Sequence, residues 1–169
     1  MSTVIDVIVT GKTAGPYAKM INDRKRECYL PFVVFSYPKG IAFKDVQAAL
    51  DIMCGSVLGG NTLEALKATG TWNGEQEASC VVILPDNKHA VLWPILALAF
   101  DHFQQEAVIA VSRNRQACLY TDIPDRLGYV TISPEYLGIW ESRGNKKPEG
   151  EDYTEVAGVY YTIRKRKGE

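Results

Sequence analysis

The chain has 169 residues, 46% of them apolar and 23% charged, with a formal net charge of −1. A chain of this length forms one domain and buries roughly 70% of its unfolded surface, so it can fold without disulfides. The balanced charge excludes a broad electrostatic attraction to nucleic acids or membranes, and we expect neither as a partner.

The first half of the chain predicts one strand and two helices. Residues 1–30 form an N-terminal extension to a single domain over 31–169. The run PFVVFSY, rich in β-branched and aromatic residues, predicts a buried strand over 31–37. Apolar residues at helical spacing predict a helix over 43–53, and a second helical segment over 62–68 precedes a glycine that would cap it.

The middle of the chain predicts a hairpin and the main helix. An Asn-Gly pair at 73–74 is typical of a tight hairpin turn, and an apolar strand follows it over 78–84. A helix is expected over 93–106, because a proline near its start is tolerated in the first turn. Two strands are expected next, over 107–111 and 117–120.

The last third of the chain predicts strands over 129–132 and 137–140, a polar loop over 142–152 and a closing strand over 156–163. The whole series gives the order β-α-β-β-α-β with additional strands. This order predicts an α+β fold, a ferredoxin-like α/β sandwich with an N-terminal extension.

The cysteines are far apart and form no CxxC pair or Cys/His cluster, so a reducing compartment is expected. We find no signal peptide and no stretch of 18 uncharged apolar residues, and therefore expect a cytoplasmic protein. The cysteines are Cys28, Cys54, Cys80 and Cys118.

Familiar cofactor and nucleophile motifs do not occur. Gly11-Lys12-Thr13 imitates the end of a P-loop, but Asp6 stands where that motif needs its first glycine. No GxGxxG or GxSxG is present, and His89 and His102 lack the spacing of a zinc site. An enzymatic activity would therefore use no metal, no cofactor and no covalent nucleophile.

Three local patterns remain. They are Gly70-Thr71-Trp72 entering the hairpin, Glu77-Ala78-Ser79 opening a buried strand, and the run FQQEAV over 103–108 at the end of the main helix. A structural interpretation is available for each, because a strand-edge carboxylate and a polar helix end are common. If the helix packs across the strand, however, a carboxylate and an amide come together.

These motifs, in this order, resemble those of the phage S-adenosylmethionine-degrading enzymes, the SAM lyases. The resemblance covers residues 31–163 and includes an echo at the C-terminal end, Gly158-Val159-Tyr160-Tyr161-Thr162. It implies that Glu77 and Gln105 are catalytic and that Trp72, Ser79, Gln104 and Phe103 bind substrate. Gln104 is the alternative to Gln105 if the register slips by one residue. Trp72 replaces the family's tyrosine, and the hairpin is shorter than usual.

The resemblance further implies a reaction, an assembly and a setting. S-adenosylmethionine would be cleaved to methylthioadenosine and homoserine lactone by intramolecular carboxylate attack, although the sequence leaves open whether lactone or free homoserine is released first. The protein would be a PII-like homotrimer with sites between subunits. It would act in the host bacterial cytoplasm as a phage counter-defence against restriction-modification.

Two other functions stay open at this point. The chain could be a non-catalytic, PII-like nucleotide-binding module or an anti-defence protein that acts by contact. It could also be a host-associated domain with an unrelated ligand.

Overall fold

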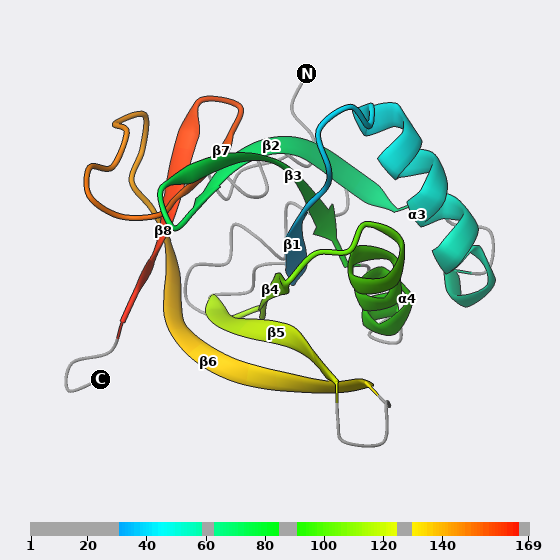
Figure 1. The fold of residues 1–169 in the computed structure, drawn as a ribbon. Coiled ribbons are helices and arrows are strands. Elements are labelled where there is room, and N and C mark those ends of the chain that lie inside the picture. The colour runs from blue at the N-terminus through cyan, green and yellow to red at the C-terminus, as the bar shows by residue number, and fades with distance from the viewer. Residues whose placement is uncertain (1–30, 59–62, 85–90, 125–129, 166–169) are drawn as a thin grey trace.

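The structure is a computed structural model that describes residues 31–58, 63–84, 91–124 and 130–165. The proposed N-terminal extension, residues 1–30, lies outside the described residues. Within them the chain forms β1 (Phe32–Ser36), α3 (Phe43–Leu58), β2 (Glu64–Trp72), β3 (Glu75–Ile83), α4 (Leu92–Ala97), the π-helical turn η2 (Leu98–His102), β4 (Ala107–Val111), β5 (Gln116–Pro124), β6 (Val130–Ser142), β7 (Thr154–Val156) and β8 (Val159–Arg164) (Figure 1).

The strands form one closed antiparallel barrel in the order β1-β3-β2-β7-β8-β6-β5-β4. The barrel closes at β1, where Phe32 pairs with Ile83 of β3 on one side and with Val111 of β4 on the other. The prediction of a ferredoxin-like or PII-like α/β sandwich is therefore wrong. The β-α-β-β-α-β order of the first elements is present, but β5, β6, β8 and β7 continue the sheet around to β2 and leave no open sandwich.

The two faces of the barrel wall carry two separate cores. On β1, Val33 and Phe35 point outward into an apolar cluster beneath α3 and α4, which lie on the same side of the barrel (Figure 1). Phe32 and Val34 point inward and pack in the barrel interior, where the Phe32 ring meets Trp140 edge to face at 5.1 Å. Successive side chains of a strand alternate between faces, so every second residue of β1 lies inside.

The helices differ from their predicted extents. In the segment predicted as a helix over 62–68, residues 64–68 belong to β2, because pairing with β3 from Glu64 to Trp72 outweighs the helix-forming residues of the sequence, and residue 62 lies outside the described residues. The main helix is shorter than predicted, because it widens into the π-helical turn η2 and ends near Phe103. The Phe103 amide donates there to the Leu98 carbonyl, 3.0 Å away, and the Gln105 amide donates to the Ala99 carbonyl at 2.9 Å.

The turns agree in part with the sequence. The predicted hairpin turn is confirmed, with φ of 51° at Asn73 and 81° at Gly74, the positive values that a type I′ turn requires. The predicted closing strand is two strands, because Ala157 and Gly158 make a second turn with φ of 51° and 85°. The two strands predicted over 129–132 and 137–140 are one, β6, from residue 130 onward, and residue 129 lies outside the described residues.

Candidate functional site

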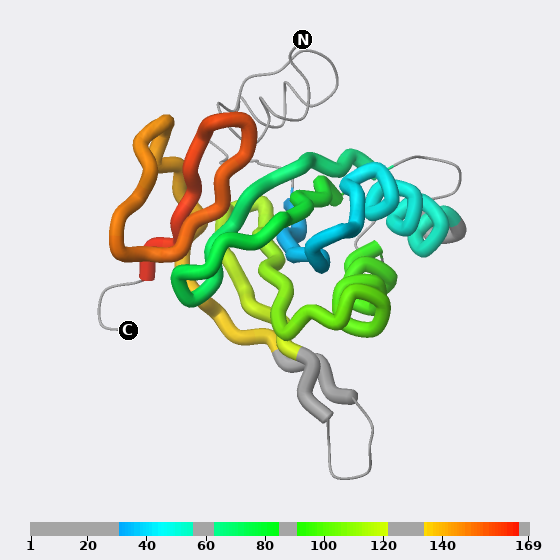
Figure 2. Tube along the Cα trace, turned by 45° about the horizontal axis from the view of Figure 1, so that its top comes forward, coloured from blue at the N-terminus to red at the C-terminus, as the bar shows by residue number. Residues whose placement is uncertain are grey.

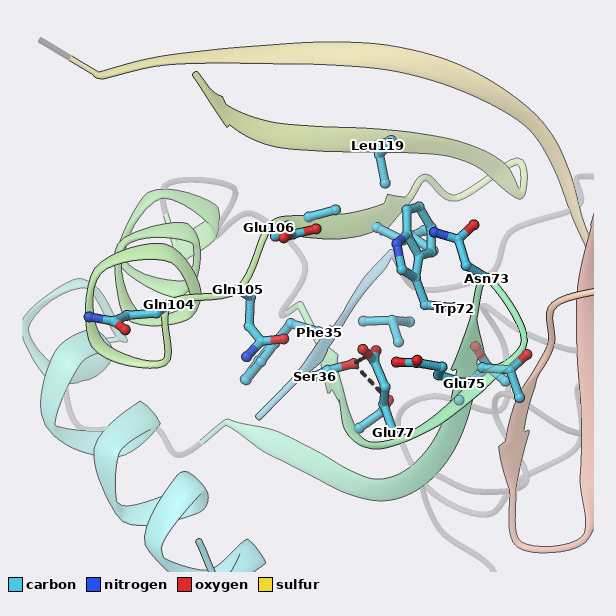
Figure 3. A pocket seen from close by; sticks show the side chains of 17 residues that line it. Phe35, Ser36, Trp72, Asn73, Glu75, Glu77, Gln104, Gln105, Glu106 and Leu119 are labelled. Atoms are coloured by element: carbon cyan, nitrogen blue, oxygen red, sulfur yellow. Dashed lines mark hydrogen bonds between the residues drawn. The ribbon is translucent and has the colours of Figure 1, made fainter. Parts of the chain in front are cut away.

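A cavity of about 430 Å³ opens where the interior core ends (Figure 3). Strand alternation explains its position. Ser36 lies two residues beyond Val34, and Ser79 lies two residues before Val81, so the serines share the inner face with those core residues. The lining comes from β1, β2, β3, β4, β5, β7 and the segment after η2. It comprises Val34, Phe35, Ser36, Gly70, Thr71, Trp72, Asn73, Glu75, Glu77, Ser79, Gln104, Gln105, Glu106, Ala107, Ile109, Leu119 and Thr154.

Five of the six site residues expected from the sequence line this cavity: Trp72, Glu77, Ser79, Gln104 and Gln105. The sixth, Phe103, does not, because it is 3% exposed in the outer core and its ring is stacked 6.2 Å from that of Phe35. The structure thus brings the Glu77 carboxylate and the Gln105 side chain to one cavity, although 28 positions separate them in the numbering.

Glu77 is held by a hydroxyl that the sequence did not single out. Ser36 Oγ donates a hydrogen bond of 2.7 Å to Glu77 Oε2 (Figure 3). Ser36 Oγ also lies 3.2 Å from Ser79 Oγ. The single hydroxyl proton of Ser36 points to the carboxylate, so Ser79 is the donor in the second bond. One oxygen of Glu77, Oε1, has no partner among these hydroxyls.

Gly70 provides the space for this arrangement. It pairs with Glu77 across the β2–β3 ladder, two residues from Ala68, the direct partner of Ser79. A Cβ atom at this position would lie 3.0 Å from Ser79 Oγ. The glycine of the Gly70-Thr71-Trp72 pattern is therefore explained by packing against Ser79.

The end of η2 separates the two glutamines. Gln104 has φ of 53°, and this left-handed residue reverses the chain direction after the helix. Gln105 extends toward the Ser36 side of the cavity, whereas the Gln104 side chain points away from the cavity (Figure 3). The Gln105 side chain is fixed by donation from Nε2 to the Phe103 carbonyl at 2.9 Å, which leaves Oε1 and the second N–H available.

The cavity is acidic. Glu75 and Glu77 follow each other on the inner face of β3, and Glu106 faces them from the segment before β4 (Figure 3). None of the described residues that line the cavity is a lysine, arginine or histidine. The field of three carboxylates without a basic counterpart favours a ligand that carries positive charge.

The hairpin tip that carries Trp72 is tied down by the loop before β7. The Asp152 carboxylate accepts hydrogen bonds of 3.1 Å from the amides of both Asn73 and Gly74. Thr71 Oγ1 accepts another from the Tyr153 amide at 2.9 Å. Figure 2 shows this loop, in orange, beside the green tip of the β2–β3 hairpin. These bonds place the Trp72 ring, 37% exposed, at the rim of the cavity.

A second cavity of about 700 Å³ adjoins the first at Trp72. Its lining includes Trp140 and Tyr161, whose rings stack at 5.2 Å, together with Thr162. Tyr161 and Thr162 belong to the C-terminal Gly-x-aromatic pattern, so that pattern also lies beside Trp72. The acidic cavity and the more aromatic one therefore share part of their lining: Thr71, Trp72, Ile109 and Thr154.

Within the part of the chain that the structure describes, no three histidine, cysteine or carboxylate side chains group as metal ligands do. None of the helices in that part is both long enough and apolar enough to cross a membrane. The sequence matches no protein-family model, and it matches no curated protein.

Proposed function

We propose that this chain cleaves S-adenosylmethionine to methylthioadenosine and homoserine lactone. The observation that carries the proposal is the convergence of Glu77, Gln105, Ser79 and Trp72 on one acidic cavity. The motif resemblance selects these residues from the sequence alone. Their convergence in space is an independent property of the fold, and it supports the same assignment.

The charge of the cavity suits this substrate. S-adenosylmethionine carries a sulfonium, an ammonium and one carboxylate, and is therefore a net cation. A phosphate-bearing nucleotide would instead place negative charge beside Glu75, Glu77 and Glu106. Each close pair of like charges 4 Å apart would cost about 1–4 kcal/mol. The cavity thus favours the sulfonium substrate over the nucleotide of the alternative, non-catalytic function.

The reaction is complete within the substrate. An oxygen of its carboxylate attacks the γ-carbon, and the bond from that carbon to sulfur breaks with both electrons going to sulfur. A neutral thioether and a lactone result, with no net proton transfer. The protein supplies orientation, which can contribute roughly 7–11 kcal/mol to such an intramolecular step. Because opposite charges are neutralised, a cavity that excludes water favours the transition state.

Three of the four converging side chains contact the substrate in this proposal. Glu77 Oε1 binds the cationic part of the substrate, while its Oε2 accepts from Ser36. Gln105 hydrogen-bonds the amino-acid end and bends it toward the γ-carbon. Trp72 stacks on the adenine or offers its face to the sulfonium, a contact worth about 0.5–2 kcal/mol.

The proposal extends to the assembly and the setting. We place the activity in the cytoplasm of an infected bacterium, where loss of the methyl donor would disarm methyl-dependent restriction. The expected assembly is a homotrimer with each cavity completed by a neighbour. Light scattering on the purified protein tests the assembly independently of activity, and a monomer at assay concentration would refute it.

The experiment that tests the function is incubation with S-adenosylmethionine, with methylthioadenosine followed by chromatography. Glu77→Gln and Gln105→Ala are compared with Glu149→Gln, which changes an exposed carboxylate outside the cavity. We expect turnover in the wild type and the control, and its loss in both cavity variants. A folded wild type that forms no product above the spontaneous background would exclude the lyase. Binding without turnover would then identify the non-catalytic alternative.

A further inference from the structure

Ser36, the last residue of β1, donates a hydrogen bond to the candidate catalytic carboxylate. Its Oγ lies 2.7 Å from Glu77 Oε2 and 3.2 Å from Ser79 Oγ. The sheet register places the three residues together, because Ser36 pairs directly with Ser79 across the β1–β3 ladder. Glu77 precedes Ser79 by two residues on the same face, so its side chain reaches the same hydroxyl.

The hydrogen bonds in this group run in one direction. The Glu77 carboxylate only accepts, so the Ser36 proton lies between Ser36 and Glu77. Ser79 must then donate to Ser36, and at 2% exposure Ser79 is nearly closed off from solvent that could compete for its proton. Gly70 also lies near Ser79 Oγ and offers no side chain as a second hydrogen-bond partner. Ser79 therefore donates to Ser36, and Ser36 donates to Oε2 of Glu77.

We propose that Ser36 is a positioning residue that holds the Glu77 carboxylate with Oε1 turned toward the cationic part of the substrate. This inference rests on the proposed function and adds a residue to it. A glutamate has three side-chain torsions, and a half-buried one without a partner samples several of them. Fixing one carboxylate oxygen with a hydroxyl selects a single orientation, which is what an orientation-driven reaction needs.

The test compares Ser36→Ala and Ser36→Thr with Ser142→Ala, which removes an exposed hydroxyl on β6 that lines none of the cavities described above. We expect Ser36→Ala to lower kcat by on the order of 10–100-fold, the loss associated with a misplaced reacting group, with a smaller change in KM. Ser36→Thr, which keeps the hydroxyl, restores most of the rate. Equal losses in the alanine and threonine variants would assign the effect to side-chain shape and would overturn the proposal.

A double-mutant cycle separates positioning from general structural damage. It uses the affinity for sinefungin, an uncleavable analogue with an ammonium in place of the sulfonium, in Ser36→Ala, Glu77→Gln and the double variant. If Ser36 acts through Glu77, its removal changes affinity in the wild type and has little further effect once Glu77 is glutamine. If the double variant loses affinity by the product of the two single losses, Ser36 acts independently of Glu77, and the proposal is refuted.

The proposed function and the role of Ser36 can be refuted separately. A wild type that neither cleaves S-adenosylmethionine nor binds sinefungin overturns the function and this inference together. A wild type that cleaves the substrate, with a Ser36→Ala variant as fast as the Ser142→Ala control, overturns the role of Ser36 alone.

Discussion

Replacing Gly70 by alanine tests whether the glycine is required by the hydroxyl that faces it. Gly70 is outside the left-handed region, so alanine can adopt its backbone conformation. In a strand, the substitution would on its own stabilise the fold by about 0.5–1 kcal/mol. The new methyl group would, however, lie 3.0 Å from Ser79 Oγ, a crowding that costs about 1–3 kcal/mol in a packed interior. We therefore expect a net destabilisation of about 1 kcal/mol.

The same substitution in a Ser79→Ala background should have the opposite sign. Without Oγ, the next atom along is the Tyr153 carbonyl oxygen at 3.7 Å, an ordinary contact, so Gly70→Ala should stabilise that background by about 0.5–1 kcal/mol. Urea unfolding of the four proteins measures both values, with unchanged m as the check that the unfolded states are comparable. An equal effect of Gly70→Ala in both backgrounds would refute the steric explanation.

Three further predictions concern the hairpin tip, the outer core and the cavity. Asp152→Ala should lower the free energy of unfolding by about 0.5–1.5 kcal/mol because two backbone amides lose their acceptor; Glu149→Ala on the same loop, measured by the same urea unfolding, should have little effect. Burial raises the pKa of the buried Cys54 thiol from 9.0 to about 11. This group therefore contributes stability below pH 9 that is lost as the pH rises toward 11, by up to about 2 kcal/mol. Cys54→Ala should flatten that part of the pH profile of unfolding, and an unchanged slope would contradict the assignment. Glu75→Gln should raise KM for S-adenosylmethionine about two- to five-fold with kcat nearly unchanged, as expected for an exposed charge that attracts the substrate, whereas Glu149→Gln should leave both constants at wild-type values. A lowered kcat would instead place Glu75 in the reaction itself.

The members of the candidate site were predictable where each follows a local pattern. Glu77 and Ser79 alternate at the start of an apolar strand, and Gln105 follows the end of a helix. Ser36 was missed because it is the second-last residue of a run, PFVVFSY, that is apolar on both faces. Such a run has no alternation to show which residues point inward, so nothing in it distinguishes Ser36 from a strand terminus.

The barrel was not predictable from the same patterns. The segment over 64–72 begins with Glu, Ala, Leu and Lys, all good helix formers, and becomes a strand only because β3 and β7 flank it. Closure depends on β1 meeting β4 and on β7 reaching β2. These pairings join distant parts of the chain, and no local window of sequence encodes them.

The β2–β7 pairing also gives the barrel a weak point. Its ladder has two residue pairs, Thr69 with Glu155 and Gly70 with Thr154, and is continued by the bond from the Thr71 amide to the Tyr153 carbonyl, whereas β2 and β3 pair along nine positions. Local opening begins where few hydrogen bonds hold an element in place, so we expect the barrel wall to open first between β2 and β7. Because Gly70 and Thr154 also line the acidic cavity, such an opening would widen the cavity itself. Amide hydrogen exchange along β7 would then report on how ligands enter, and a bound ligand should slow it.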